Sequence, residues 1–145
     1  MRRIVNEVLL SLTFLIVFPF FSLAAENGIK NKNPFDWNPV MNAIIEVESQ
    51  NNRFAQSGNS IGAMQITPIM VVECNFILRS RKSKKRYKLS DRFNIKKSKE
   101  MFLLFQSKYN PRNNIERAIR SWNGGLNYSI KYTQRYFEKV LKLVR

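Results

Sequence analysis

Apolar residues recur along most of this chain at the three- and four-residue spacings of helices that bury one face. The clearest example is the set Ile115, Ala118, Ile119 and Trp122, which fall at positions i, i+3, i+4 and i+7. Similar patterns predict further helices at about 38–52, 68–78, 95–109 and 130–143. No segment alternates convincingly between apolar and polar residues, and none is repeated. The pattern therefore predicts a mainly α protein, with about five helices in one domain.

Capping signals mark the ends of several predicted helices. Asn38-Pro39 and Thr67-Pro68 each place a capping residue before a proline, and proline is favoured at the first helical position. Asn123-Gly124-Gly125 is expected to end the fourth helix. The segment 53–66 is rich in glycine and small polar residues, which predicts a loop or a short irregular strand.

The first 24 residues have the three parts of a secretory signal peptide. Two arginines precede an apolar run over residues 8–21, and small residues follow up to Ala24. A membrane-spanning helix needs about 20 apolar residues, so we expect cleavage after Ala24 rather than an uncleaved anchor. Residues 25–37 are expected to form a flexible segment before a domain at 38–145. Export would place the protein in the periplasm or outside the cell, associated with the envelope.

The charge of the chain indicates its partners more than its fold. There are 25 Lys and Arg against 10 Asp and Glu, a formal net charge of +15, which favours binding to anionic polymers. For an exported protein this means an envelope polymer rather than nucleic acid. The basic run 79–90 has a simple interpretation as a solvated loop. The alternative is that it binds anionic glycan or another anionic envelope polymer.

The residue types limit the chemistry available to the protein. The chain has no His, which excludes Ser-His and Cys-His nucleophiles and argues against the usual zinc sites. Cys74 is the single cysteine, so no intrachain disulfide can form, and we expect it to be a small buried residue. We expect no metal and no cofactor. Catalysis would depend on carboxylates, hydroxyls, amides or lysines.

Two glutamates near the end of the first predicted helix are candidates for such chemistry. Glu46 and Glu48 are two positions apart, so they point to nearly opposite sides of a helix and only one can face a cleft. Helical periodicity does not choose between them. Glu48 lies at the exit of the helix, where apolar neighbours can partly desolvate a side chain that lines a groove. Desolvation raises the pKa of a carboxyl group and keeps a general acid protonated. A surface glutamate in a last helical turn is the commoner alternative.

Five short motifs follow one another along the chain. They are Glu48-Ser49, the strip Gly62-Ala63-Met64-Gln65-Ile66-Thr67-Pro68, Asn94-Ile95, Trp122-Asn123-Gly124-Gly125 and Tyr136-Phe137-Glu138-Lys139-Val140. In this order and spacing the chain resembles the lytic transglycosylases of bacterial cell walls, in the lysozyme-like superfamily that includes the goose-type lysozymes. The resemblance covers residues 39–143. It implies a lysozyme-like domain with a catalytic groove.

The resemblance also implies roles for individual residues. Glu48 matches the single catalytic acid, and the substrate-binding positions of the family match Ser49, Met64, Gln65, Trp122, Asn123 and Tyr136. Met64 and Tyr136 could instead be core residues, whereas Gln65 and Asn123 are harder to explain in a core because a buried amide needs partners. The family usually has tyrosine at the position of Trp122. An indole N–H only donates a hydrogen bond, so any tuning of the acid by that tyrosine would be altered here.

The implied reaction cleaves the bond between N-acetylmuramic acid and N-acetylglucosamine in peptidoglycan. Glu48 would protonate the glycosidic oxygen and then accept the proton of the C6 hydroxyl, which closes a 1,6-anhydro ring. One alternative is a hydrolytic muramidase on the same fold, although most glycosidases need two carboxylates and no second one is singled out by spacing. Another is a non-catalytic cationic wall-binding protein. A nucleic-acid module is supported only by charge. We expect the protein to act as a monomer.

Overall fold

The computed structural model describes residues 35–144, which form helices and one small sheet. The α-helices are α1 (Asn38–Ser49), α2 (Pro68–Ser80), α3 (Ile95–Tyr109), α4 (Ile115–Gly124) and α5 (Ile130–Leu143). The shorter elements are the 3-10 helix η1 (Leu89–Phe93) and the antiparallel strands β1 (Gln56–Ser57) and β2 (Ser60–Ile61). The predicted mainly α class with five helices is confirmed. The strands lie in the segment 53–66, as expected.

Side chains before the helices bond to backbone N–H groups of the first turn, which have no partner within the helix. Three capping side chains do so: Thr67, as predicted, and also Asn94 and Asn114, for which no cap was predicted. The predicted cap at Asn38 is wrong. Trp37 occupies the cap position of α1, and Asn38 lies inside the helix. The Asp36 carboxylate accepts the Asn38 backbone N–H at 2.9 Å, so an acidic residue takes the role expected for the asparagine.

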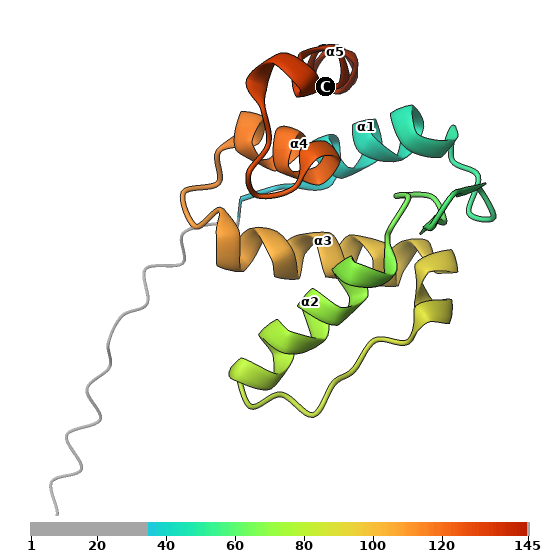
Figure 1. Ribbon diagram of the computed structural model, residues 1–145, viewed down its shortest axis with the longest axis vertical. Coiled ribbons are helices and arrows are strands. Elements are labelled where there is room, and N and C mark those ends of the chain that lie inside the picture. Colours follow the sequence, from blue (N-terminus) through green and yellow to red (C-terminus); the bar gives the residue numbers. More distant parts are fainter. Residues whose placement is uncertain (1–34, 145) are drawn as a thin grey trace, which may run out of the picture. The chain divides into compact units, whose positions relative to one another are not determined.

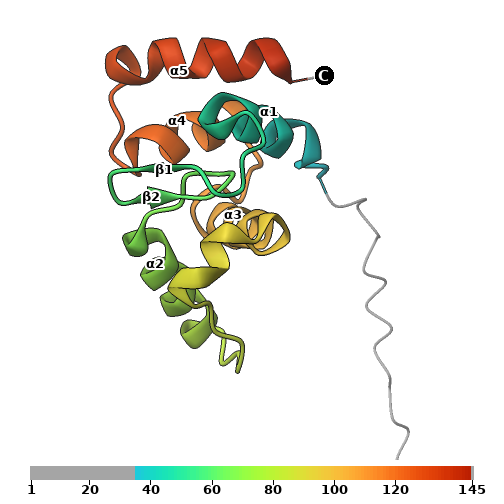
Figure 2. The ribbon, with the colours of Figure 1, turned by 90° about the vertical axis from the view of Figure 1, so that its right-hand side faces the viewer.

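The helices pack in an arrangement that places the end of α1 against α5. Helix α5 contacts both α4 and α1, while α2 packs against α3. Figures 1 and 2 show α1 and α4 between α5 on one side and α3 with α2 on the other. The chain leaves α1 directly into the β1–β2 hairpin. Residues of α5 therefore face the last turn of α1.

An aromatic group joins these helices in the core. Phe102 is fully buried, and its ring centroid lies 5.6 Å from that of Trp37 and 5.2 Å from that of Trp122. Trp37 was assigned to the flexible segment 25–37, but it is buried and belongs to the core. Cys74 is a buried free thiol, as expected. Burial raises its pKa to about 12, so it is not a reactive thiolate.

Gly62 allows the turn after β2 to approach η1 closely. Its φ of +86° lies in the left-handed region, and a Cβ at this position would lie 1.9 Å from the Arg92 carbonyl oxygen. The Arg92 guanidinium is itself buried and donates to the carbonyl oxygens of Asn59 and Ile66 at 3.0 and 3.2 Å. Gly62 thus has a structural role, which arises from a contact about thirty residues away in sequence.

The basic run 79–90 is only partly the solvated loop that its composition suggests. Its first two residues belong to α2, and most of its Lys and Arg side chains are exposed. Tyr87 is buried, and its backbone N–H and carbonyl both bond to the Asn75 side chain, at 2.8 and 2.9 Å. The run is therefore anchored to α2 near its end.

The predicted signal peptide at 1–24 and most of the segment 25–37 lie outside the described residues. Within residues 35–144, none of the helices has both the length and the apolar content required to cross a membrane.

Candidate active site

The last turn of α1 separates the two candidate glutamates as helical geometry requires. Glu46 is exposed and accepts a hydrogen bond from the Asn51 side-chain amide at 2.6 Å. Glu48 is partly buried and faces α5. Helix α1 ends immediately afterwards, because Gln50 and Asn51 adopt left-handed backbone conformations. Glu46 lines a separate cavity of about 420 Å³ with Lys139 and Lys142 of α5, but of the two glutamates only Glu48 accepts a hydrogen bond from that helix.

Tyr136 of α5 holds the Glu48 carboxylate. Its hydroxyl donates to Glu48 Oε1 at 2.7 Å. Burial raises the pKa of Glu48 above its ordinary value, and the hydrogen bond from Tyr136 lowers it by a smaller amount. The pKa of the Tyr136 hydroxyl is also raised, first by burial and then by the adjacent carboxylate, so it remains a donor. A carboxyl with a raised pKa and a fixed orientation is suited to general acid catalysis.

A cavity of about 460 Å³ opens beside this pair. We call it the Glu48 cavity, and it is lined by Val47, Glu48, Asn123, Tyr132, Arg135, Tyr136 and Lys139. Glu48 is the one acidic side chain among these lining residues. The cavity thus combines a single acid with two cations from α5.

Helix α5 contributes three lining residues that the sequence motifs did not identify. Tyr132, Arg135 and Lys139 stand at i−4, i−1 and i+3 relative to Tyr136. These spacings place them on the face of the helix that carries Tyr136. Helical periodicity around Tyr136 could therefore have identified them, once that tyrosine was assumed to face the acid.

Two residues that were expected to contact the sugar, Ser49 and Gln65, instead bond to backbone carbonyl oxygens of the loop that follows α1. The Ser49 hydroxyl donates to the Ala63 carbonyl oxygen at 2.9 Å, which ties the end of α1 to the turn after β2. The Gln65 side-chain amide donates to the carbonyl oxygens of Gly62 and Ala55, at 2.9 and 3.2 Å. Neither side chain lines the Glu48 cavity. Both fix the position of the loop next to it.

Met64 is a core residue and does not line a groove. Its side chain has no exposed surface, which agrees with the core alternative and not with the expected contact to a glycan. Its carbonyl oxygen accepts the indole N–H of Trp122 at 3.2 Å. The indole N–H is therefore already engaged, and no bond joins Trp122 to Glu48. The expectation that Trp122 replaces a partner of the acid is not supported by this geometry.

Asn123 connects the Glu48 cavity to a second one. It is exposed, and it lines both the Glu48 cavity and a neighbouring space of about 370 Å³. We call this space the Trp122 cavity, because the partly buried Trp122 lies in its wall beside Met70 and Leu126. Asn123 thus lies between the cavity beside the acid and a second cavity whose wall includes apolar side chains.

Glu73 is the acidic side chain that lines the Trp122 cavity. Lys108 donates to it at 2.9 Å, and the Tyr109 hydroxyl donates to the same oxygen. Burial would raise the pKa of Glu73, but these hydrogen bonds and the charge of Lys108 outweigh it and lower the pKa. Glu73 is therefore an ionised carboxylate near the groove. Sequence spacing did not single it out.

Within residues 35–144, no group of three or more His, Cys, Asp or Glu side chains is placed to hold a metal ion. Comparisons of the chain with models of protein families, with curated proteins and with solved structures found no match. The site is accordingly interpreted from its own geometry.

Proposed function

We propose that this protein is a peptidoglycan lytic transglycosylase with a lysozyme-like domain, in which Glu48 acts first as acid and then as base. The observation that carries the proposal is the Glu48–Tyr136 pair. A partly buried carboxyl with a raised pKa and a 2.7 Å hydrogen bond stands at the edge of an open cavity. Such a group can protonate a glycosidic oxygen at a pH where an exposed glutamate would be ionised.

The single acid of the Glu48 cavity suits this reaction. Glu48 transfers its proton to the leaving oxygen, and the bond between the muramic acid C1 and that oxygen breaks. The resulting carboxylate takes the proton of the C6 hydroxyl, whose oxygen attacks C1 to close the anhydro ring. Proton and charge balance without water, metal or cofactor. Arg135 and Lys139 border the cavity and favour an anionic wall polymer over a neutral glycan.

Hydrolysis is the second candidate, and Glu73 is the observation that favours it. A muramidase of the common kind needs a second carboxylate near the bond that is cleaved. Glu73 is ionised and lines the adjoining cavity. Its hydrogen bonds to Lys108 and Tyr109 occupy the carboxylate, which argues against a role in activating water.

We further propose that residues 1–24 export the protein, which then acts as a monomer on glycan strands in the periplasm or outside the cell. Nucleic acid is not an expected partner. The exposed cations of the run 79–90 would add general attraction to anionic wall polymers.

Digestion of purified peptidoglycan by the wild type and by Glu48→Gln tests the proposal. Loss of the acid should lower the rate by about 10²–10⁴-fold, while the exposed Glu46→Gln is the matched control and should retain activity. Mass spectrometry of the products distinguishes the two reactions. Anhydro-ended fragments are expected, and fragments heavier by one water molecule would support hydrolysis. Full activity of a folded Glu48→Gln variant would leave only a non-catalytic wall-binding role.

A further inference from the structure

A third cavity lies next to the Trp122 cavity. It has a volume of about 580 Å³ and lies between the end of α3, the start of α4 and the loop before α5. Tyr109 lines both this space and the Trp122 cavity, just as Asn123 lines both the Trp122 cavity and the Glu48 cavity. We call it the Arg117 cavity. Each of these cavities thus shares one lining residue with its neighbour, Asn123 or Tyr109.

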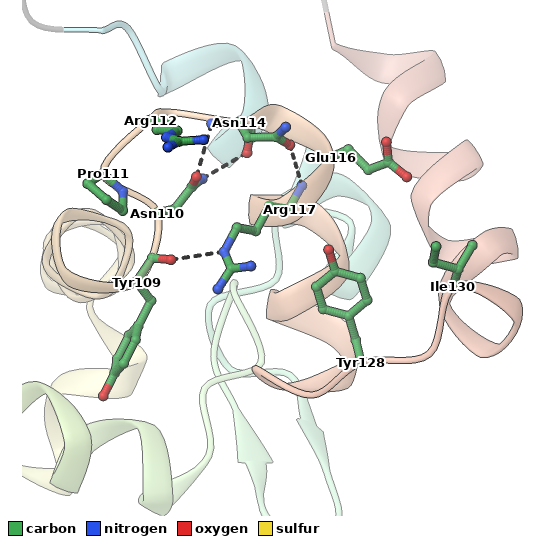
Figure 3. Close-up of a pocket in the computed structure, with 9 residues that line it drawn as sticks. All are labelled: Tyr109, Asn110, Pro111, Arg112, Asn114, Glu116, Arg117, Tyr128 and Ile130. Carbon is green, nitrogen blue, oxygen red and sulfur yellow. Dashed lines mark hydrogen bonds between the residues drawn. The ribbon is translucent and has the colours of Figure 1, made fainter.

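Hydrogen-bond donors without protein partners gather in the Arg117 cavity. The Arg117 Nε donates to the Tyr109 carbonyl oxygen at 2.9 Å, which fixes the guanidinium and leaves both terminal nitrogens without a partner among the described residues. Figure 3 shows this guanidinium between Tyr109 and Tyr128, and in this view Arg112 and Asn114 lie above it. Within residues 35–144, no side chain bonds to the guanidinium of Arg112 or to the hydroxyl of Tyr128.

The acidic residue in this cavity does not neutralise these cations. The Glu116 carboxylate accepts a hydrogen bond from the buried Arg120 at 2.7 Å, and in Figure 3 it points away from Arg117. The cavity is therefore left with two arginines and a phenolic hydroxyl, all donors. A guanidinium presents two parallel N–H groups, a geometry that matches a carboxylate.

We infer that the Arg117 cavity binds a free carboxylate of the short peptides carried by the muramic acid residues of peptidoglycan. The inference rests on the proposed function, because it assumes that a glycan strand lies over the Glu48 and Trp122 cavities. Arg112 and Arg117 thereby make peptide-bearing strands the preferred substrate. Both are positioning residues that act on the peptide, away from the bond that is cleaved.

The dimensions of α4 allow this arrangement. Asn123 and Arg117 are six residues apart on the same helix, which corresponds to roughly 9 Å along its axis and about 120° around it. An extended tetrapeptide spans up to about 13–14 Å. A carboxylate at the end of such a peptide can therefore reach Arg117 around the surface of the helix while its sugar lies near Asn123.

Paired substrates test the inference. Glycan strands with their peptides are compared with the same strands after an amidase has removed the peptides. The wild type should cleave the peptide-bearing strands faster, and Arg112→Gln/Arg117→Gln should lose this preference by about tenfold while cleaving bare strands at the wild-type rate. The matched control is Arg79→Gln/Arg81→Gln, which removes the same charge from the basic run. Loss of the preference in this control as well would overturn the inference, because it would show general electrostatic attraction.

Direct binding distinguishes failure of the inference from failure of the proposed function. The probe is a free stem tetrapeptide, titrated calorimetrically into the Glu48→Gln protein, with its carboxyl-amidated form as the comparison. Binding that weakens about tenfold on Arg117→Gln or on amidation supports the inference. If peptidoglycan is cleaved but the peptide does not bind, the inference fails and the proposed function stands. If the peptide binds but no strand is cleaved, the proposed function fails and the cavity remains a peptide site.

Discussion

Replacing Gly62 by alanine should be the most damaging small change near the site. The new methyl group would lie 1.9 Å from the Arg92 carbonyl oxygen, whereas ordinary contacts of a Cβ begin at 3.4 Å. The two segments would have to separate by 1.5 Å, and Arg92 would be drawn away from the acceptors of its buried guanidinium. The neighbouring loop would move too, because Gly62 also accepts the Gln65 amide.

The free-energy cost has two parts. An alanine with φ of +86° costs about 1–2 kcal/mol. Weakening the hydrogen bonds of a buried charged group adds about 1.5–3 kcal/mol, so the total is about 2.5–5 kcal/mol. Small domains have a stability of about 5–15 kcal/mol, and each kcal/mol changes Tm by roughly 4–8 °C in domains close to this size. We therefore expect Tm to fall by at least about 10 °C.

Gly58→Ala is the matched control for this experiment. Gly58 also has a positive φ, of +56°, but nothing lies within 4 Å of a Cβ there. It should cost only the backbone part, about 1–2 kcal/mol. Thermal and denaturant unfolding of the two variants gives the comparison. Equal destabilisation by Gly62→Ala and Gly58→Ala would refute the close approach of Gly62 to Arg92 and the reasoning built on it.

Two further substitutions test the two carboxyl groups, Glu48 and Glu73, that line the Glu48 and Trp122 cavities. Tyr136→Phe removes the hydrogen bond that lowers the pKa of Glu48, so this pKa should rise and the acid should remain protonated to higher pH. The alkaline side of the pH–rate profile should shift upward, and an unshifted profile would contradict the role of Tyr136. Glu73→Gln removes a partly exposed ion pair with Lys108 and should cost at most about 1 kcal/mol. Cleavage of peptidoglycan should continue, and its loss in a folded variant would favour a two-carboxylate hydrolase.

The boundaries of the helices were largely predictable because they depend on local chemistry. The pattern Ile115, Ala118, Ile119 marks the buried face of α4, and the cap at Thr67 is made by its own side chain. The exception is Asn38, whose own backbone N–H is accepted by the Asp36 carboxylate, so Asn38 is the first helical residue and not the cap. Which of two nearby polar side chains bonds to the first turn is not visible in a pattern of residue types.

The candidate site was predictable in part. Motifs placed Glu48, Tyr136 and Asn123 together, and they do line one cavity. They also assigned sugar contacts to Ser49 and Met64, where the structure has a backbone anchor and a core residue. A motif preserves the spacing of residues but not the direction of each side chain, which depends on what packs against it.

The sequence by itself determined the mainly α class, the ends of most helices and the exclusion of Ser-His and Cys-His nucleophiles that follows from the absence of His. Only the tertiary structure decided which glutamate is held by a partner. Glu46 and Glu48 have the same chemistry, and it is the packing of α5 on α1 that desolvates one and leaves the other in water. The Glu48 and Trp122 cavities likewise have no sequence signal, because their walls come from segments that are distant along the chain.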